Sequence, residues 1–378
     1  MKKRTAAIFS INMHTHMLNY GSALQSFALQ QNLRRINVDS VIVDYVASYA
    51  KLFYKRNYLT YKVKLCPIND FLKLERWAFS RKIKEIKFKK FFAKYYKTTK
   101  GTFFEEDLIS KTNIEGVDFD TFICGSDTVW KLDQTNGFDN VFYLNIPAAK
   151  GKNKVAYACS MGSRDFTSDE IASFKKLTSD FKGIGLRERS RVTQFNQYLD
   201  KPAIQVVDPT LLLNAEDYAK IAKLPKQDDY VLLYTIEAND SKMTEEAIRF
   251  AKEKGLKLIE ITPYYNNKYL YDHKVINDAG VEEWLGWFMN ASYIITNSFH
   301  GMCFSVIFKK KAFLFERDRT DSKMPDLCNM LGLHNCLIPC DDKIIKTDDL
   351  DINWKDVYSR LDEVRGISND FLKRMLSE

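Results

Sequence analysis

The feature that most constrains the fold of this chain is the alternation of short apolar runs with amphipathic helical stretches. In the first half the apolar runs have strand length and lie at residues 5–11, 40–45, 119–124, 154–158, 183–187 and 203–207. Helical patterns lie between them, at 22–34, 168–181 and 190–198. Strands that alternate with helices form a parallel sheet covered on both faces. The first half therefore predicts a doubly wound α/β domain.

The second half repeats this rhythm after residues 208–229, which show no sustained periodicity. Strands are expected at 230–236, 257–261, 293–296 and 312–315, and helices at 244–254 and 281–290. A chain of 378 residues accommodates two domains of about 150 residues with an insertion. We predict an N-terminal domain (1–212) with a basic helical insertion (68–100), a linker (213–228), a C-terminal domain (229–350) and a helical tail (351–378) that packs back on the N-terminal domain.

Composition excludes several other classes of protein. With 45% hydrophobic and 28% charged residues, the chain falls outside the disordered, collagen-like and coiled-coil classes. No run of about 18 apolar residues predicts a membrane-spanning helix, and the apolar run at 6–11 is too short for a secretory signal. Seven cysteines without a C-x-x-C pair favour a reducing compartment, so we expect a cytoplasmic protein.

Positive charge is concentrated in one segment. The formal net charge is +8, and residues 73–100 alone hold eleven Lys or Arg against two Glu. Aromatic and aliphatic residues alternate with these bases, as in a basic amphipathic helix. Such a helix either packs on its own domain with a solvated outer face or binds an anionic membrane surface. A nucleic-acid partner is not expected, because no recognisable nucleic-acid-binding module accompanies it.

Four loops at predicted strand ends hold residues that can bind a ligand, because open α/β sheets bind ligands at the carboxyl ends of their strands. Gly21 and Ser22 form either an anion or hydroxyl site or a simple helix cap. Asp127 can orient a sugar hydroxyl beside the ring of Trp130, or cap a helix. Arg187 can hold phosphate or carboxylate, or pair with its neighbour Glu188.

His300 occupies the fourth loop, between the strand at 293–296 and an apolar helix at 302–308. A histidine can exchange a proton near neutral pH, and the adjacent helix N-terminus can hold an anion. The competing interpretation is a capping or buried histidine. His14 and His16 alternate as metal ligands can, and His334, Cys336 and Cys340 form a partial zinc pattern, but neither set has enough ligands, so no metal is expected.

Six motifs, taken together and in this order, resemble the polysaccharide pyruvyl transferase family. They are N-Y-G-S-A-L-Q (19–25), G-S-D-T-V-W (125–130), A-C-S-M-G (158–162), R-E-R-S (187–190), V-V-D-P-T-L-L-L (206–213) and N-S-F-H-G (297–301). The resemblance extends from about Asn19 to residues 331–333, and the basic segment lies outside it.

The resemblance implies a GT-B-like pair of Rossmann-type domains that face each other across a cleft. It further implies an enzyme that moves the enolpyruvyl group of phosphoenolpyruvate onto two hydroxyls of a sugar, forming a ketal and releasing phosphate, with no cofactor or metal. By that analogy His300 and Arg187 are catalytic. Residues expected to bind the donor are Arg187, Arg189, Asn297, Ser298, Gly301, Arg319 and Lys323. Residues expected to bind the acceptor are His14, Asn19, Gly21, Ser22, Asp127 and Trp130.

The resemblance also bears on the setting of the reaction. Capsule and exopolysaccharide units of bacteria are commonly built on lipid-linked intermediates at the cytoplasmic face of the membrane, so we expect a lipid-linked saccharide acceptor and a peripheral membrane contact through residues 73–100. Neutralising Lys82, Lys84, Lys87 and Lys89 is expected to weaken that contact. Two alternatives remain open, a GT-B glycosyltransferase that uses a nucleotide sugar and a non-catalytic glycan-binding protein.

Overall fold

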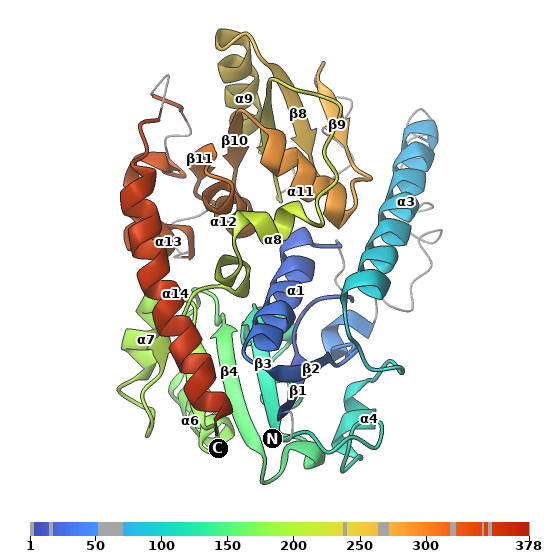
Figure 1. Cartoon of the computed structure of the whole chain (residues 1–378), viewed down its shortest axis with the longest axis vertical. Coiled ribbons are helices and arrows are strands. Elements are labelled where there is room, and N and C mark those ends of the chain that lie inside the picture. The colour runs from blue at the N-terminus through green and yellow to red at the C-terminus, as the bar shows by residue number, and fades with distance from the viewer. Residues whose placement is uncertain are drawn as a thin grey trace. The chain divides into compact units, whose positions relative to one another are not determined.

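The computed structural model describes residues 4–14, 18–51, 71–236, 240–263, 272–317, 323–341, 344–346 and 350–377, with the side chains of 71–77 left out. The chain divides into two compact units, which Figure 1 colours along the sequence. Unit 1 comprises residues 1–54, 95–213 and 359–378, and unit 2 comprises residues 55–94 and 214–358.

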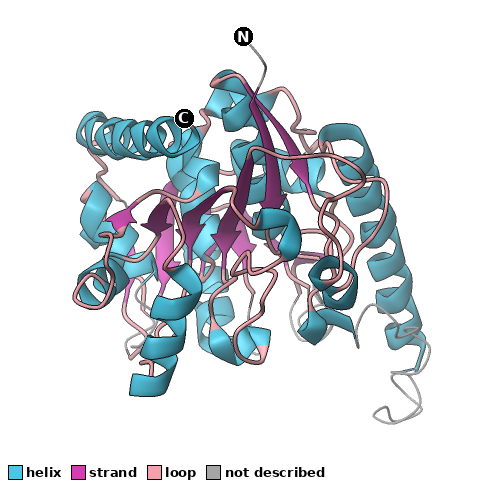
Figure 2. Cartoon of the chain, turned by 90° about the horizontal axis from the view of Figure 1, so that it is seen from below, coloured by secondary structure: helices cyan, strands magenta, loops and turns pink. Residues whose placement is uncertain are grey.

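Unit 1 is built on a parallel sheet of six strands in the order β2-β1-β3-β4-β5-β6. The strands are β1 (Arg4–Phe9), β2 (Val38–Ile42), β3 (Thr121–Asp127), β4 (Asn153–Cys159), β5 (Gly183–Leu186) and β6 (Ile204–Gln205). The helices are α1 (Tyr20–Arg35), α4 (Glu105–Ile109), α5 (Leu132–Thr135), α6 (Ser168–Thr178) and α7 (Arg189–Phe195). Figure 2 shows helices on both sides of the strands.

The core of unit 1 explains why its strands are so apolar. All seven residues of β3 are buried, because the strand is central and covered on both faces. Trp130, immediately after β3, is fully buried and stacks on Tyr143 with the ring centroids 5.1 Å apart. Its indole nitrogen donates to the carbonyl of Phe142. The structure therefore contradicts the expectation that Trp130 offers a ring face to a sugar, since the ring is enclosed by the core.

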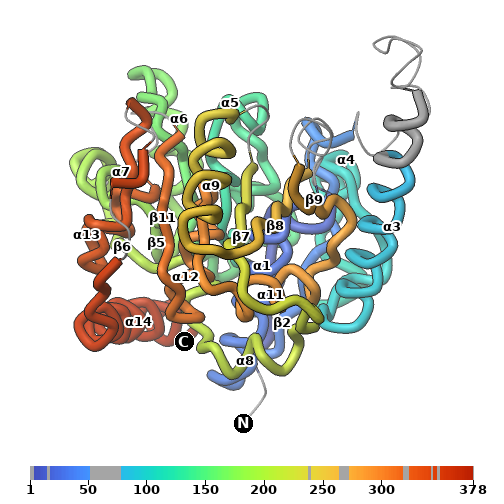
Figure 3. The backbone as a smooth tube through the Cα atoms, turned by 90° about the horizontal axis from the view of Figure 1, so that it is seen from above, coloured from blue at the N-terminus to red at the C-terminus, as the bar shows by residue number. Residues whose placement is uncertain are grey.

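Unit 2 contains a second parallel sheet of six strands in the order β12-β11-β10-β7-β8-β9, and its backbone can be followed in Figure 3. The strands are β7 (Tyr230–Tyr234), β8 (Lys257–Ile261), β9 (Lys274–Ile276), β10 (Tyr293–Thr296), β11 (Lys311–Phe315) and β12 (Leu337–Ile338). The helices include α3 (Phe71–Tyr95), α8 (Ala215–Ala219), α9 (Ser241–Glu253), α11 (Val281–Asn290), α12 (Phe299–Ile307) and α13 (Lys323–Leu331).

Two sheets of this kind confirm the predicted fold class of two Rossmann-type doubly wound units. The cleft between them stays a prediction. None of the described helices combines the length and the apolar character that crossing a bilayer requires.

The last helix, α14 (Trp354–Leu376), packs closely on β5 at two positions where the strand has glycine. Residues 359–376 of this helix belong to unit 1, where Ser368 accepts a hydrogen bond from the backbone of Val207. A β-carbon on Gly183 would lie 3.1 Å from the ring of Phe371, and one on Gly185 would lie 3.2 Å from that ring. The glycines therefore allow α14 to approach β5 closely.

The position of the basic helix differs from the prediction. Residues 68–100 were expected as an insertion in the N-terminal domain, but the chain up to Lys94 groups with unit 2. Lys87 donates to Glu283 (2.7 Å) and to the carbonyl of Asp278 (3.0 Å), and Lys94 pairs with Glu282 (3.0 Å). The lysines of α3 therefore attach the helix to α11 and the loop before it. These contacts join segments that are far apart in the sequence, and they place α3 in unit 2.

Candidate functional site

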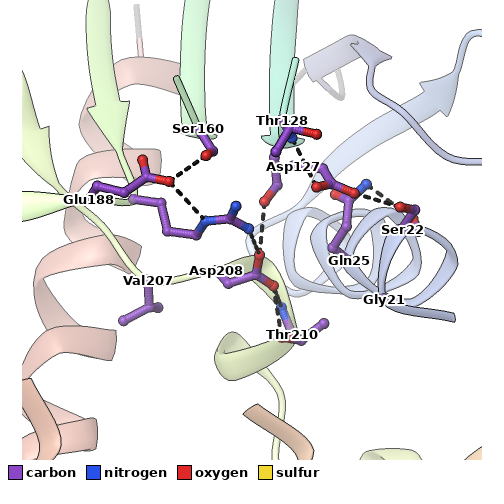
Figure 4. Close-up of polar contacts among 12 residues, drawn as sticks. Gly21, Ser22, Gln25, Asp127, Thr128, Ser160, Glu188, Val207, Asp208 and Thr210 are labelled. Atoms are coloured by element: carbon purple, nitrogen blue, oxygen red, sulfur yellow. Dashed lines mark hydrogen bonds and ion pairs between the residues drawn. The ribbon is translucent and has the colours of Figure 1, made fainter. Parts of the chain in front are cut away.

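Polar side chains collect at the carboxyl edge of the sheet in unit 1, where ligands of open α/β sheets bind. Figure 4 shows this polar cluster, which draws residues from α1 and from the ends of several strands. Its members, joined to one another by hydrogen bonds and ion pairs, are Ser22, Ser126, Asp127, Ser160, Arg187, Glu188, Asp208 and Thr210.

The N-terminus of α1 lies against the end of β3. Asn19 is the N-cap, and its side-chain oxygen accepts from the backbone nitrogens of Gly21 (2.8 Å) and Ser22 (3.3 Å). Ser22 is therefore not the cap. Its hydroxyl instead donates to Oδ2 of Asp127 at 2.5 Å (Figure 4). The structure thus brings together four residues that were expected to bind the acceptor, namely Asn19, Gly21, Ser22 and Asp127.

The backbone at the end of β3 adopts an unusual conformation. Ser126 and Asp127 have φ angles of 23° and 71°, in the left-handed region that side chains disfavour. Hydrogen bonds hold this turn: the Ser10 hydroxyl donates to the carbonyl of Ser126 (3.1 Å), and the Ser160 nitrogen donates to that of Asp127 (2.9 Å). Such strain persists only where the surroundings fix it, and it concentrates at functional sites.

Arg187 lies at the end of β5 and is 6% exposed. Its Nη1 donates to Oδ2 of Asp208 at 3.0 Å, and its Nε lies 3.8 Å from Oε1 of Glu188. Burial lowers the pKa of Arg187, but the carboxylates of Glu188, Asp208 and Asp127 outweigh burial and raise it, so the guanidinium stays charged. Arg187 does pair with its neighbour Glu188, as the alternative interpretation expected, but both side chains are buried and Asp208 is the closer partner.

Asp208 is the most connected of the cluster members that were not predicted as site residues, which are Ser126, Ser160, Glu188, Asp208 and Thr210. Besides Arg187, its carboxylate accepts from the hydroxyl of Ser126 (3.1 Å) and from the nitrogen (3.0 Å) and hydroxyl (2.7 Å) of Thr210. The D-P-T sequence after an apolar run could have indicated it, because Asp before Pro commonly caps a turn. Here Asp208 caps the 3-10 helix η5 (Pro209–Leu212) and joins the ends of β3 and β5.

Two other predicted residues of unit 1 have different surroundings. His14 pairs with Asp44, whose other carboxylate oxygen accepts from Thr102 at 2.7 Å, so His14 already has a partner within unit 1. Arg189 is the first residue of α7 and is exposed, in contrast to the buried Arg187. The structure therefore buries Arg187, which was expected to be catalytic, and exposes Arg189, which was expected only to help bind the donor.

The candidate residues of unit 2 lie at the end of β10. Asn297 is buried and joins this strand end to that of β7, since its Oδ1 accepts from the nitrogen of Ile236 at 3.0 Å. Ser298 is the N-cap of α12, and its hydroxyl accepts from the nitrogen of Gly301 at 3.3 Å. Both side chains therefore order the strand-to-helix turn that precedes His300.

His300 is the second residue of α12, and it is 7% exposed. The packing beneath it explains Gly301, because a β-carbon at that position would lie 2.4 Å from Oγ1 of Thr296. That hydroxyl is itself fixed, as it donates to the carbonyl of Tyr234 at 2.7 Å. Gly301 thus lets the first turn of α12 sit directly on the strand end, which fixes the height of His300 above the sheet.

Two further residues, Arg319 and Lys323, were predicted to bind the donor substrate. Arg319 lies outside the described residues, and Lys323 is the half-buried first residue of α13. Within the described part of the chain, no group of three potential metal ligands occurs.

Comparison with solved structures places this fold among two-domain Rossmann-like enzymes of the GT-B type. UDP-N-acetylglucosamine 2-epimerase from Rickettsia bellii is 12% identical, with a TM-score of 0.50 over 98% of this chain and 95% of that one. UDP-GlcNAc 2-epimerase from Methanocaldococcus jannaschii is 13% identical, with a TM-score of 0.50 over 99% of each chain. At these identities the similarity shows the fold alone. A search of curated proteins finds no match by sequence.

The class of protein is thus a two-domain α/β enzyme fold whose strand ends hold polar and charged residues. A family model described as "Polysaccharide pyruvyl transferase" matches residues 19–319. The chain belongs to the polysaccharide pyruvyl transferase family. This family match confirms the resemblance found in the motifs and makes the chain a transferase of polysaccharide biosynthesis, with a pyruvyl donor and a sugar acceptor implied.

Proposed function

We propose that the protein transfers the enolpyruvyl group of phosphoenolpyruvate onto two hydroxyls of a saccharide, forming a ketal and releasing phosphate. The observation that carries this proposal is the family match over residues 19–319, which includes both candidate clusters. The acceptor we propose is a lipid-linked saccharide of capsule or exopolysaccharide synthesis. No cofactor or metal enters the proposal.

The reaction needs one group that gives and takes a proton. The enol carbon of the donor must be protonated, C2 becomes cation-like, one sugar hydroxyl adds, phosphate leaves, and the second hydroxyl closes the ketal. We assign the proton transfer to His300, because it lies in the first turn of α12, after the end of β10, where a histidine can act as general acid and base. Asn297, Ser298 and Gly301 order the turn that holds it.

The cluster of unit 1 supplies hydrogen-bond acceptors suited to a sugar. The carboxylate of Asp127 is held by Ser22 and by the nitrogen of Thr128 (2.9 Å), which leaves lone pairs for hydroxyl donors. We assign Asp127 to the acceptor saccharide. Arg187 remains the proposed donor contact, although Asp208 and Glu188 already balance its charge.

The test is to incubate the purified protein with phosphoenolpyruvate and a saccharide acceptor. We expect inorganic phosphate release and an acceptor that gains one pyruvylidene group by mass spectrometry. A nucleotide sugar in place of phosphoenolpyruvate should give no product, and product formation from it alone would instead establish the glycosyltransferase alternative. Absence of any product with either donor would favour the glycan-binding alternative.

His300→Ala should lower kcat by about 10²–10⁴-fold, the usual contribution of general acid-base catalysis. His334→Ala is the matched control, because this histidine is exposed in the same unit and lies in the 3-10 helix at 334–336, outside α12. Normal turnover by His300→Ala, with the fold intact by circular dichroism, would remove His300 from the mechanism.

A further inference from the structure

One face of α3 exposes large apolar side chains. Phe79 is 68% exposed and Ile86 is 44% exposed. They lie seven residues apart, which is about two helical turns, so they point to the same side of the helix, roughly 10 Å apart along its axis. Burying one such side chain in an apolar phase is worth about 1.5–3 kcal/mol, so leaving both in water is unfavourable unless another surface covers them.

Other sides of α3 make contacts within the protein. Phe88 and Phe91 are buried on the side away from Phe79, and Lys87 and Lys94, on the flank between the two sides, pair with α11 through Glu283 and Glu282. These contacts fix the rotation of the helix about its axis. The orientation of Phe79 and Ile86 toward solvent is therefore set by the packing of the helix.

The exposed face is positively charged as well as apolar. Lys82 and Lys89, with side chains 64% and 72% exposed, both bridge to Glu85, and Lys90 is exposed beside them. From residue 78 to 94 the helix has seven Lys or Arg and a single acid, Glu85. Positive charge excludes a basic partner and favours an anionic one.

Apolar side chains flanked by lysines on one helix face match the interface of an anionic bilayer. The apolar groups enter the acyl boundary, while the lysine ammonium groups reach the lipid phosphates on flexible stems. We propose that the outer face of α3, formed by Phe79, Lys82, Ile86, Lys89 and Lys90, docks on the surface of an anionic phospholipid bilayer. The proposal deepens the proposed function, because docking on a bilayer would bring the enzyme to a lipid-linked acceptor. It rests on the proposed function only in this respect.

The structure also corrects which residues take part. Lys84 is 4% exposed, and burial followed by repulsion from Arg81 lowers its pKa to about 7. Lys87 is engaged by Glu283. Of the four lysines expected to bind a membrane, only Lys82 and Lys89 lie on the outer face, and Lys90 joins them.

The first experiment is co-sedimentation of the full chain with vesicles of phosphatidylglycerol and phosphatidylcholine. We expect binding that weakens with salt and is absent with phosphatidylcholine alone. The double variant Phe79→Gln and Ile86→Gln should lose about tenfold or more in affinity. Ile344→Gln is the matched control, because Ile344 is 53% exposed in the same unit and precedes Ile345, whose carbonyl accepts from Arg249 of α9, and its binding should equal that of the native chain.

The second experiment removes charge. Neutralising Lys82, Lys89 and Lys90 to Gln should lower affinity about a hundredfold, since each lysine near an anionic surface contributes about fivefold. The variant Lys226→Gln, Lys242→Gln and Lys252→Gln makes the same change in net charge at exposed sites of unit 2 and should bind normally. Equal loss in both variants would show that net charge alone acts, which would overturn a docking face on α3.

Two further results would overturn the proposal. One is vesicle binding unchanged in the Phe79 and Ile86 variant. The other is a dimer that analytical ultracentrifugation detects for the native chain but not for this variant. That result would mean that a second copy of the chain, and not a bilayer, covers the outer face of α3. Transfer to a water-soluble saccharide acceptor, measured in the same variants, tests the reaction separately. It should be unchanged, so a failure of docking is distinguishable from a failure of the proposed function.

Discussion

At the scale of single residues, the pair formed by Arg187 and Asp208 gives the first prediction. Both side chains are buried, so removing one partner leaves an uncompensated charge. Arg187→Gln is expected to reduce the free energy of unfolding by about 3–5 kcal/mol. Asp208→Asn should cost a similar amount, and the double variant should cost less than the two single losses combined. Urea denaturation of the three variants measures this coupling.

Arg189 provides the control for that pair. It is two residues away and exposed, so Arg189→Gln should change stability by no more than about 0.5 kcal/mol. Strictly additive losses in Arg187→Gln and Asp208→Asn would contradict the buried ion pair. If Arg187 also contacts the donor, the conservative variant Arg187→Lys should raise the KM for phosphoenolpyruvate under conditions in which the variant remains fully folded.

Asp139 gives a pH-dependent prediction. Its carboxylate accepts from the hydroxyl of Tyr45 (2.8 Å) and from two backbone nitrogens, yet burial raises the pKa of Asp139 to about 6. The folded protein therefore keeps this proton at pH values where the unfolded chain has released it. The contribution of Asp139 to stability should fall by about 3 kcal/mol as the pH rises from about 4 to 6.

Asp139→Asn isolates this effect, because an amide can still accept from the backbone and does not ionise. The Tm of the variant relative to the native chain should rise as the pH increases from 4 to 7, by differential scanning calorimetry. A difference in Tm that stays constant across this range would show that Asp139 does not titrate with a raised pKa.

Single residues also show where sequence reasoning stops. Asp127 and Ser22 were expected in one site because each follows a strand end, and the structure brings them within 2.5 Å. Trp130 has the same kind of position in the sequence but turns into the core. Which way a side chain faces after a strand depends on backbone angles such as the φ of 71° at Asp127, and these are not visible in the order of residues.

At the scale of elements, α14 and β5 give a prediction about close packing. A β-carbon on Gly185 would lie 2.9 Å from the side chain of Val206 and 3.2 Å from that of Phe371. Gly185→Ala should therefore lower stability by about 1–3 kcal/mol, as overpacking usually does. Thermal unfolding checks this value.

Gly366 is the matched glycine within α14. No atom lies within 4 Å of a β-carbon there, so Gly366→Ala should stabilise the helix by up to about 1 kcal/mol. Equal effects of the two substitutions would mean that the contact between α14 and β5 is not close.

Periodicity located the regular elements well where the pattern is strong. The predicted bounds of β8, β10 and α11 coincide with the observed ones, because each is an apolar or amphipathic run bounded by polar residues. The short strands β9 and β12 were missed, since two or three residues give no period. The helix α3 was expected from its pattern, but its attachment to α11 depends on Glu282 and Glu283, almost two hundred residues away.

At the scale of the whole molecule, each unit has its own buried sheet, and the repeated alternation of strands and helices indicated this from the sequence. The basic helix was expected in the N-terminal domain but groups with unit 2, because its assignment depends on contacts between distant segments. Residues 359–378 group with unit 1, on which the helical tail was expected to pack. Since each unit has its own core, we expect the units to respond separately to substitutions that disrupt one core.

Buried cysteines report on each unit. Cys124 and Cys159 are buried in unit 1, and Cys303 and Cys328 are buried in unit 2. Burial raises the pKa of the Cys124 and Cys328 thiols well above the usual range, so alkylation requires opening of the core. A pulse of alkylating reagent in mild denaturant, read by peptide mass spectrometry, therefore measures the opening of each unit.

Two substitutions distinguish the units in this experiment. Gly185→Ala crowds unit 1, whereas Gly286→Ala places a β-carbon 1.9 Å from the backbone oxygen of Lys223 in unit 2. We expect the first to increase labelling of Cys124 and Cys159 at lower denaturant while Cys303 and Cys328 follow the native curve, and the second to do the reverse. Labelling of all four cysteines at one shifted midpoint in either variant would show that the two units unfold as a single cooperative body.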